Sequence, residues 1–172
     1  MKSGVDPRRV FWPIVSVWVL LDVLTKRWAE SALVPVPPQE ILGEFLRLRL
    51  VYNRGAAFGL HLGEYSRWIF LVIALVAVIG ISWKARDHDW KEWLRQIAAA
   101  LVVGGAAGNL IDRIRGTAGV VDFIDVGIGL TRWPTFNVAD IGVSCGAVAL
   151  AISFWLEDSR RARAAAAAER AG

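Results

Sequence analysis

Hydrophobic and polar positions divide the chain into four long apolar segments separated by polar connections. The apolar segments span about residues 10–28, 68–83, 94–110 and 138–156. Each approaches the roughly 20 apolar residues that a helix needs to cross a bilayer. The pattern predicts an all-α membrane protein with four transmembrane helices in a single domain over residues 1–172.

The long connection between the first two segments carries strand signals. Pro35, Pro37 and Pro38 stop any helix, and the later stretch FLRLRLVYN alternates leucine with arginine. This period of two is typical of a strand with one apolar face, so we predict a small extracytoplasmic β-sheet platform over about 29–67. The glycines of NRGAAFG, residues 53–59, then allow a turn that brings the backbone close to another part of the molecule.

Composition supports a membrane protein. Of the 172 residues 55% are hydrophobic, nine are tryptophan, and the mean hydropathy is +0.43. The net charge is +4, but no basic run interleaves with an aromatic platform, so we expect no nucleic acid partner. Lys2, Arg8 and Arg9 precede the first apolar segment, as in a signal peptide. No clean small-residue cleavage site follows and three more segments come later, which favours a retained helix.

Lysine and arginine residues in the connections orient the predicted helices. The amino end, the connection KARDHDWKEW and the tail share one side, and nearly as many basic residues lie on the other side, spread over much longer connections. Both termini are therefore placed in the cytoplasm. The alanine-rich tail, about 157–172, is low in complexity and is predicted to be a frayed helix or disordered, without chemistry of its own.

Three polar stretches fall on the extracytoplasmic side of this topology: DVLTK, YNRGAAFG and the span from GNLIDR to FNVAD. Ionisable groups in hydrocarbon cost about 2.5 to 3.5 kcal/mol at a helix centre and usually have a function. Structural roles are nevertheless favoured for two pairs. Asp22 and Lys26 are four residues apart and can neutralise each other, and Asp112 with Arg113 forms a charged pair at a helix end.

Two further aspartates carry the strongest chemical signal. Asn137 precedes Asp140 by three residues, the pattern of an N-cap with a carboxylate in the first helical turn, so capping and catalysis are equally open for Asp140. Asp122 lies in GVVDFID, a predicted strand or extended loop in which desolvation would raise its pKa. Cys145 is expected to be a small apolar packing residue.

Glycine pairs predict how the last two helices meet. Gly104 and Gly108 in the third segment, like Gly142 and Gly146 in the fourth, let another backbone approach closely. The third and fourth helices would then be held near each other, which draws Asp122 and Asp140 together.

Two carboxylates brought close at an apolar, partly wetted surface tend to share one proton. One can act as general base on a water while the other acts as general acid toward a carbonyl or a leaving amine, which is the chemistry of aspartic peptidases. The sequence has no P-loop and no cluster of histidine and cysteine with metal-ligand spacing. A metal held by the paired aspartates is disfavoured, because hard cations usually take more oxygen ligands.

Five motifs, in this order, make the chain resemble lipoprotein signal peptidase, also called signal peptidase II, over nearly its whole length. They are DVLTK (22–26), NRGAAFG (53–59), GGAAGNLIDR (104–113), GVVDFID (119–125) and FNVAD (136–140). The family's catalytic pair falls on Asp122 and Asp140, whereas Asp112 and Asp125 are not its acid and base. The resemblance implies that the site is further shaped or supported by Asp22, Lys26, Asn53, Gly55, Asn109, Arg113 and Asn137.

The resemblance also implies a function. Such enzymes are membrane aspartic endopeptidases of the bacterial cytoplasmic (inner) membrane, and they remove signal peptides from diacylglyceryl-modified prolipoproteins. They cleave on the amino side of the lipidated lipobox cysteine, near the extracytoplasmic face. The expected partners are these precursors, membrane lipids and globomycin-type inhibitors. No metal or organic cofactor is expected, and the chain is expected to act as a monomer.

Two other functions fit parts of the pattern. A small membrane transporter or proton relay could use the aspartates near the apolar spans, but it predicts acidic groups at several depths and on both sides. The sequence instead clusters them on one side. A non-catalytic scaffold of helices packed through small residues is the third reading, and loss of precursor cleavage in folded asparagine variants would argue against it.

Overall fold

The computed structural model describes residues 6–34, 36–54, 56–57, 60–61, 65–87, 90, 92–116 and 118–171. Its helices are η1 (Pro7–Val10, a 3-10 helix), α1 (Phe11–Ala32), α2 (Ser66–Lys84), α3 (Trp93–Arg115) and α4 (Val138–Ala171). Its strands are β1 (Gln39–Leu42), β2 (Leu46–Asn53), β3 (Ala56–Ala57), β4 (Leu60–His61), β5 (Val120–Ile128) and β6 (Thr131–Arg132). A long helix therefore covers each of the four predicted apolar segments.

The helix ends differ from the prediction in three places. Helix α1 continues to Ala32 rather than to about Trp28, and α3 continues to Arg115 rather than to about Leu110. Of the two predictions for the tail, a frayed helix or disorder, disorder is wrong in the structure, because α4 runs without a break to Ala171. Alanine and arginine are strong helix formers, which explains the continuation. Charged residues ended the apolar pattern but did not end the helices.

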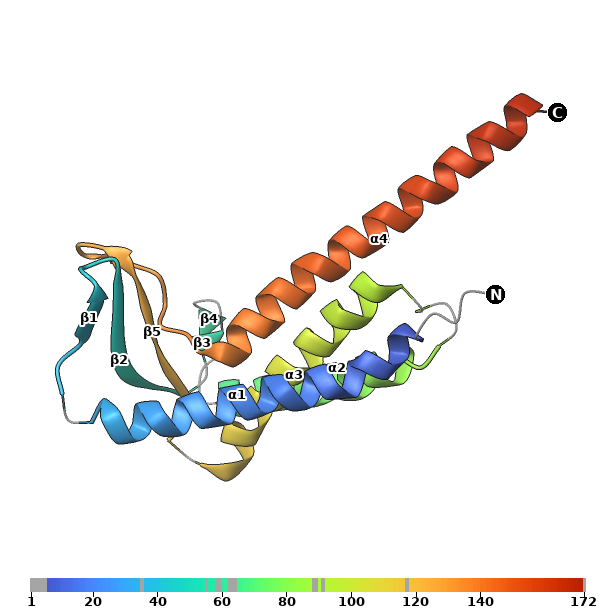
Figure 1. The fold of residues 1–172 in the computed structure, drawn as a ribbon. Coiled ribbons are helices and arrows are strands. Elements are labelled where there is room, and N and C mark those ends of the chain that lie inside the picture. Colours follow the sequence, from blue (N-terminus) through green and yellow to red (C-terminus); the bar gives the residue numbers. More distant parts are fainter. Residues whose placement is uncertain are drawn as a thin grey trace.

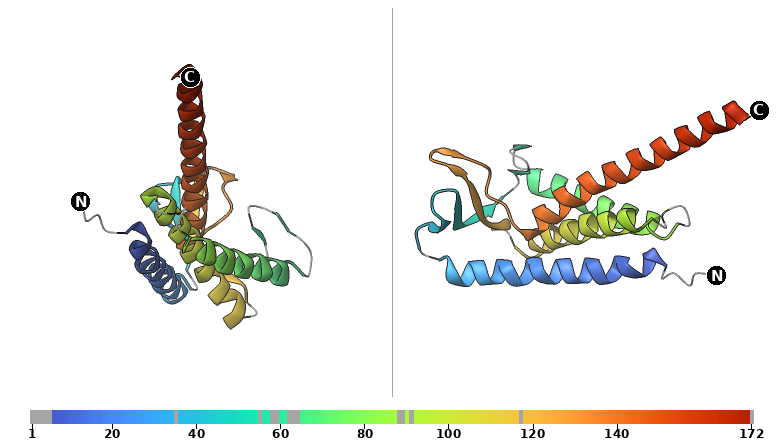
Figure 2. Two further views of the ribbon diagram at one scale, coloured as in Figure 1. Left: turned by 90° about the vertical axis from the view of Figure 1, so that its right-hand side faces the viewer. Right: turned by 45° about the horizontal axis from the view of Figure 1, so that its top comes forward.

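Helix α3 is the centre of the bundle and contacts α1, α2 and α4 (Figures 1 and 2). Its middle is built from small residues, of which Ala98, Ala99 and Ala100 are fully buried. Small side chains let three helices approach one helix at once, because little volume separates the backbones.

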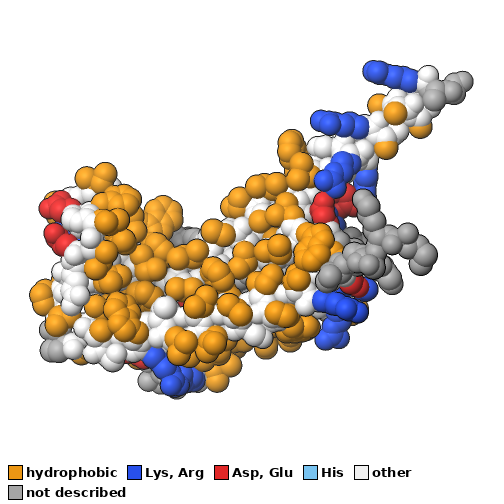
Figure 3. Space-filling model, viewed as in Figure 1, with side chains coloured by type: hydrophobic (Ala, Val, Ile, Leu, Met, Phe, Trp, Pro, Cys, Tyr) orange, Lys and Arg blue, Asp and Glu red, His pale blue; other side chains and the backbone are white. Residues whose placement is uncertain are grey.

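The other helices present apolar side chains outward. Helix α2 exposes a run of aliphatic residues, including Val72, Ile73, Val76 and Ile79. The space-filling view shows hydrophobic side chains across most of the helical part, and Lys and Arg side chains in groups at the end that carries η1, on the projecting part of α4 and at the lower left (Figure 3). A surface of this kind is suited to lipid rather than to water.

Among the described helices α2, α3 and α4 are long and apolar enough to cross a membrane. Helix α1 is also long, but its second half carries the charged residues Asp22, Lys26, Arg27 and Glu30. The structure thus supports three spans by length and composition, and the fourth predicted span stays a prediction.

The predicted glycine contacts between α3 and α4 are partly wrong. Gly104 and Gly108 face α1: a Cβ on Gly104 would lie 2.9 Å from the Trp18 Cβ, and one on Gly108 would collide with Asp22. Gly142 also faces Trp18 of α1. Adjacent residues of a helix, such as Gly104 and Gly105, point about 100° away from each other. The spacing of the glycines in the sequence therefore did not reveal which helix each glycine contacts.

The contact between α3 and α4 depends on two other positions. A Cβ on Gly105 would meet the Ala139 carbonyl oxygen, and one on Gly146 would lie 2.7 Å from the Ala98 carbonyl oxygen. Of these two only Gly146 belonged to the predicted set. The close approach of α3 to α4 is confirmed, and it brings Ala139, next to Asp140, against the middle of α3.

The predicted sheet platform over about 29–67 is incomplete. The larger sheet has the order β1-β2-β5-β6, so half of its strands come from the connection between α3 and α4. Strand β2 pairs antiparallel with β5, with Val51 opposite Asp122 and Asn53 opposite Val120. Strand β2 also pairs with β1, its neighbour in sequence, but its second partner, β5, is distant in sequence.

The sheet lies at one end of the bundle, where α1 ends and α4 begins (Figures 1 and 2). Ala29 and Leu33 at the end of α1 form a buried cluster with Val121 and Phe123 of β5. The first turn of α1 and the far end of α4 lie at the opposite end of the molecule. The predicted placement of both chain ends on one side is therefore consistent with the fold.

Candidate active site

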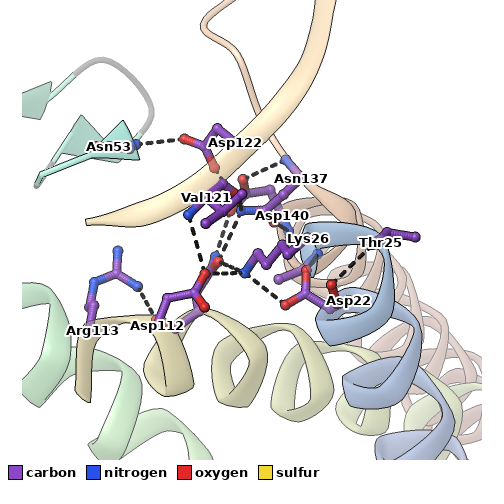
Figure 4. A network of polar contacts seen from close by, with 12 residues as sticks. Asp22, Thr25, Lys26, Asn53, Asp112, Arg113, Val121, Asp122, Asn137 and Asp140 are labelled. Atoms are coloured by element: carbon purple, nitrogen blue, oxygen red, sulfur yellow. Dashed lines mark hydrogen bonds and ion pairs between the residues drawn. The ribbon is translucent and has the colours of Figure 1, made fainter. Parts of the chain in front are cut away.

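The polar residues of the five motifs gather where α1, α3, β5 and the start of α4 meet (Figure 4). Asp122 is on β5 and is 2% exposed. Its Oδ1 accepts a hydrogen bond from Asn137 Nδ2 at 2.7 Å, and its Oδ2 accepts one from Asn53 Nδ2 at 3.0 Å. Two amide groups from different elements therefore hold this carboxylate in one orientation.

Asp140 lies in the first turn of α4, and the predicted capping role is confirmed. Asn137 Oδ1 accepts a hydrogen bond from the Asp140 N–H at 3.0 Å, and Asp140 Oδ2 accepts one from the Asn137 N–H at 3.1 Å. This reciprocal pair is a capping box. Asp140 Oδ1 accepts from Asn109 Nδ2 at 2.8 Å and is not used by the cap. Capping therefore positions Asp140 without consuming its whole carboxylate.

Asn137 links the two aspartates directly. Its side-chain amide donates to Asp122, and its backbone N–H donates to Asp140. The side chain is fully buried. Because Asn137 lies directly before α4 and close to β5, this single residue sets the relative position of both carboxylates.

Lys26 is the cation of the site and is 3% exposed. Its Nζ lies 2.7 Å from Asp22 Oδ2 and 2.9 Å from Asp112 Oδ2, and it donates to Asn109 Oδ1 at 3.0 Å. The predicted pairing of Asp22 with Lys26 is confirmed. The predicted pairing of Asp112 with Arg113 is wrong, because adjacent helical residues point to different sides and Asp112 turns toward Lys26.

The contacts of Lys26 also orient an amide. Asn109 Oδ1 accepts from both Lys26 Nζ and Asn137 Nδ2, at 3.0 and 3.1 Å. With its oxygen occupied by two donors, the Asn109 amide must present its nitrogen to Asp140. The ammonium group therefore acts on Asp140 through Asn109.

Asp22 and Asp112 attach this cluster to neighbouring elements. Asp22 Oδ1 accepts the Ala139 N–H at 2.8 Å, which satisfies an otherwise unpaired donor in the first turn of α4. Asp112 Oδ2 accepts the Val121 N–H at 3.3 Å, next to Asp122 on β5. Sequence reasoning missed this role of Asp112. Its position in the motif GGAAGNLIDR was the available signal, because it follows Asn109 by three residues on one helical face.

Arg113 lies beside the pair but makes no direct bond to either aspartate among the described contacts. Its guanidinium donates to the Asn109 carbonyl oxygen at 3.1 Å and lies 5.8 Å from the centre of the Phe70 ring. Arg67 at the start of α2 donates to the Arg113 carbonyl oxygen. Gly55, the remaining predicted site residue, lies outside the described residues.

A cavity of about 460 Å³ opens beside the two aspartates and extends between α2, α3 and α4. Asp122 and Asp140 both line it, together with Asn53, Asn109 and Arg113 at its polar end. Mostly apolar residues form the rest of the wall, among them Phe70, Ile73, Ala77, Val102 and Phe136. The arrangement suits a ligand with an extended polar part and an apolar part.

Cys145 lines the same cavity and its side chain is exposed. The prediction of a buried packing residue is therefore wrong. An apolar neighbourhood in the sequence indicates burial only where helices cover the position, and here α4 faces an open cavity.

Burial, together with the negative charge of Asp140, raises the pKa of Asp122 to about 7. Hydrogen bonds from Asn53 and Asn137 oppose this shift. The predicted upward shift is confirmed in direction. With this pKa, Asp122 can offer a protonated carboxyl group beside the carboxyl group of Asp140 near neutral pH.

No group of three or more potential metal ligands occurs among the described His, Cys, Asp and Glu residues.

Comparison with known proteins identifies the class to which this fold and site belong. A solved structure described as a bacterial membrane enzyme superposes with a TM-score of 0.77 at 29% identity, over 88% of this chain and 90% of that one. A second structure described in the same way gives a TM-score of 0.72 at 29% identity, over 84% of this chain and 92% of that one. The chain has the fold of a bacterial membrane enzyme.

Sequence similarity identifies the family. The model for signal peptidase (SPase) II matches residues 14–156. The lipoprotein signal peptidase of Hydrogenovibrio crunogenus is 44% identical over 157 residues, which cover 88% of each chain. That of Xanthomonas campestris pv. campestris is 35% identical over 170 residues, covering 96% of this chain and 99% of the relative. The chain belongs to the signal peptidase II family and is a multi-pass bacterial membrane protein.

Proposed function

We propose that this protein is a membrane aspartic endopeptidase that removes signal peptides from diacylglyceryl-modified prolipoproteins. It would cleave on the amino side of the lipidated lipobox cysteine. The observation that carries the proposal is the cavity that Asp122 and Asp140 share, with carboxylates at one end and apolar walls between helices. A precursor of this kind has a peptide bond to be hydrolysed beside a lipid and an apolar helix.

The two carboxylates have different surroundings, which supports separate roles. Asp122 is on a strand and fully buried, and its raised pKa of about 7 lets it hold a proton up to about pH 7. Asp140 lies at the N-terminus of α4 and is partly exposed, and its carboxylate accepts hydrogen bonds from Asn109 Nδ2 and from the Asn137 N–H. We assign the proton of the pair to Asp122 and the role of general base to Asp140.

Hydrolysis would then proceed in two steps. In the first step Asp140 removes a proton from a water molecule, and the water oxygen bonds to the scissile carbonyl carbon. At the same time Asp122 gives its proton to the carbonyl oxygen. In the second step the tetrahedral intermediate collapses. The C–N bond breaks, Asp140 returns its proton to the leaving amine, and Asp122 recovers the proton of the hydroxyl group. Both carboxyl groups end in their starting states.

The supporting residues have positioning roles in this proposal. Asn137, Asn53 and Asn109 orient the carboxylates, and Lys26 with Asp22 fixes Asn109 and the start of α4. Arg113 lines the cavity and adds positive charge near the substrate backbone. We further propose that Gly55 allows the adjacent loop to approach the substrate. Globomycin-type inhibitors would occupy the same cavity.

We also propose the membrane arrangement. Helix α1 is the fourth span, because it lies along the bundle and Asp22 and Lys26 are buried in the site, whereas the exposed Arg27 and Glu30 lie in its last two turns. Both termini lie in the cytoplasm, and the site lies near the extracytoplasmic face. The precursor enters laterally from the bilayer and is cleaved by a monomer without a metal or organic cofactor.

A transporter or proton relay is not favoured by the geometry. Asp22, Asp112, Asp122 and Asp140 gather at one end of the bundle (Figure 4). A relay needs successive ionisable groups at several depths. The alternative would become preferable if proton flux in liposomes depended on these aspartates while precursor cleavage did not.

The proposal is tested with Asp122→Asn and Asp140→Asn in the full chain reconstituted in liposomes. The control is Asp125→Asn, a residue on the same strand whose carboxylate pairs with Arg132 at 2.9 Å and does not line the cavity. Cleavage of a diacylglyceryl-modified precursor is followed on a gel. We expect each dyad variant to lose at least about a thousandfold in rate, because neither carboxylate can take over both roles. The control should retain cleavage.

Thermal unfolding of the variants shows whether they are folded, so that loss of structure is not mistaken for loss of chemistry. Cleavage at a near wild-type rate by either dyad variant would contradict the mechanism. Equal cleavage of precursors with and without the diacylglyceryl group would contradict the assigned substrate but leave the dyad intact.

A further inference from the structure

A second cavity lies at the opposite end of the bundle from the aspartate pair. It measures about 310 Å³ and is formed by η1 and the first turn of α1 on one side and the last turn of α2 on the other. Its lining residues are Asp6, Arg8, Arg9, Phe11, Trp12, Ser82, Ala85 and Arg86. Neither the proposed peptidase chemistry nor the helix packing accounts for it.

The lining carries excess positive charge. Three guanidinium groups face one carboxylate, that of Asp6, which leaves two positive charges uncompensated within the lining. Arg8 is held in place, because it pairs with Asp6 at 2.5 Å and donates to the Arg86 carbonyl oxygen at 3.2 Å. Arg9 and Arg86 are exposed, and within the described part of the chain neither forms a side-chain ion pair. They are the groups available to an anion.

An unused hydroxyl group lies in the same cavity. Ser82 Oγ is buried and has no hydrogen-bond partner among the described residues. A buried hydroxyl without a partner is costly, and a bound acceptor would remove that cost. Phe11 and Ala85 provide buried apolar walls, and Trp12 is 50% exposed at the rim. The cavity therefore combines cationic, hydrogen-bonding and apolar surfaces.

The position of the cavity identifies which anion fits. It lies where helices α1 and α2 reach the membrane interface, as the exposed rings of Trp12 and Trp83 at these helix ends indicate. Basic pockets between membrane helices at this level suit lipid headgroups. A free phosphate would use the arginines and Ser82 but not the apolar walls or the half-exposed tryptophan.

We propose that this cavity binds the phosphate headgroup of an anionic phospholipid from the membrane leaflet at that end. Arg9 and Arg86 would contact the phosphate, Ser82 Oγ would donate a hydrogen bond to it, and the glycerol and acyl parts would lie along Trp12 and the apolar walls. The lipid would connect the start of α1 to the end of α2. It would thereby stabilise the helix pair from the end remote from the dyad.

The test uses the full chain purified in a zwitterionic detergent and titrated with phosphatidylglycerol. Bound lipid is counted by native mass spectrometry, and thermal unfolding is recorded in parallel. The variant Arg9→Gln/Arg86→Gln should weaken the apparent affinity about 25-fold, roughly fivefold for each arginine. Ser82→Ala should weaken it by roughly tenfold. The unfolding temperature of the wild type should rise on adding the lipid, and that of the double variant should not.

The matched control is Arg163→Gln/Arg170→Gln. It removes the same two charges from exposed positions on the projecting part of α4, away from the cavity. The control should bind lipid like the wild type. Equal loss in the control would show charge attraction without a site and would overturn the proposal. Retained binding in the cavity variants, or equal stabilisation by inorganic phosphate or phosphatidylcholine, would also overturn it. None of these outcomes bears on the assignment of precursor cleavage to Asp122 and Asp140.

Discussion

At the scale of single residues, the site depends on amide groups that hold two carboxylates in different environments. Asn137 donates to Asp122 through its side chain and to Asp140 through its backbone. Asp122 is buried on a strand, and Asp140 is partly exposed at a helix N-terminus. Burial and the neighbouring charge of Asp140 raise the pKa of Asp122, so the pair can hold a proton on the strand carboxyl group.

The raised pKa of Asp122 predicts how the reaction depends on pH. The carboxyl group keeps its proton below about pH 7 and loses it above, so the rate should fall as the pH rises through about 7. On the acid side the rate should fall when the general base becomes protonated, which gives a bell-shaped profile. Initial rates of precursor cleavage across pH check this. A rate that rises monotonically with pH while the protein stays folded would contradict a shared proton.

The same shift has a consequence for stability. Because the folded-state pKa of Asp122 lies above its unfolded value, the free energy of unfolding should decrease from about pH 4 to about pH 7. This decrease should be smaller in Asp122→Asn, whose side chain does not titrate. Denaturation of both proteins over this range provides the comparison.

Lys26 should act through Asn109 rather than on the substrate. Lys26→Met frees the Asn109 amide to turn, and we expect kcat to fall roughly 10- to 100-fold with a smaller change in KM. Removing this cation also removes a charge that lowers the pKa of Asp122, so the alkaline limb of the pH profile should move upward. A purely structural role would not move that limb. The measurement is a pH series of kcat and KM.

The control for this variant is Lys84→Met, which breaks the exposed ion pair with Asp87 at the other end of the bundle. It should change neither kcat nor the pH profile. Lys26→Arg should restore part of the rate, because it keeps the charge. An unchanged alkaline limb in Lys26→Met would contradict the positioning role.

At the scale of elements, the site requires α4 to begin at one place on α3. Gly105 allows this, because its bare backbone lies against the Ala139 carbonyl oxygen and Val143. The connection between α3 and α4 also contains β5, which pairs with β2 and ends shortly before α4 begins. The connection between α3 and α4 therefore supplies Asp122 and Asn137, and it ends directly before the first turn of α4, which carries Asp140.

Gly105→Ala should separate the two helices and displace Asp140. We expect a loss of about 1 to 3 kcal/mol in the free energy of unfolding, typical of overpacking, and a marked loss of cleavage. Gly80→Ala on α2 is the control, because a Cβ there meets nothing within 4 Å. It should leave stability and cleavage unchanged or slightly improved. Equal stability of the two variants, measured by thermal unfolding, would show that the contact is not tight.

At the scale of the whole molecule, the two ends of the bundle have different chemistry. One end carries the sheet, the aspartate pair and the buried Lys26, and the other carries the arginine-lined cavity. A buried network at this other end fastens α3 to α4: Arg95 donates to Ser153 at 3.2 Å and pairs with Glu157. This asymmetry suits an enzyme whose chemistry belongs to one membrane face.

The sequence by itself determined the membrane class, the positions of four long helices and the motif residues that gather at the site. The length of each apolar segment and the order of the motifs can be read directly from the sequence, because neither depends on which elements come into contact in the folded protein. The sequence also placed Asp22 beside Lys26, because a separation of four residues defines one helical face.

Only the tertiary structure decided which elements meet. The pairing of β2 with β5, the turn of Asp112 toward Lys26 and the contacts of Gly104 and Gly108 with α1 all join residues distant in sequence. The exposure of Cys145 also depends on which helices leave the cavity open. Such contacts are selected by packing of the whole bundle, because a helix presents several faces and the sequence pattern does not say which neighbour covers each one.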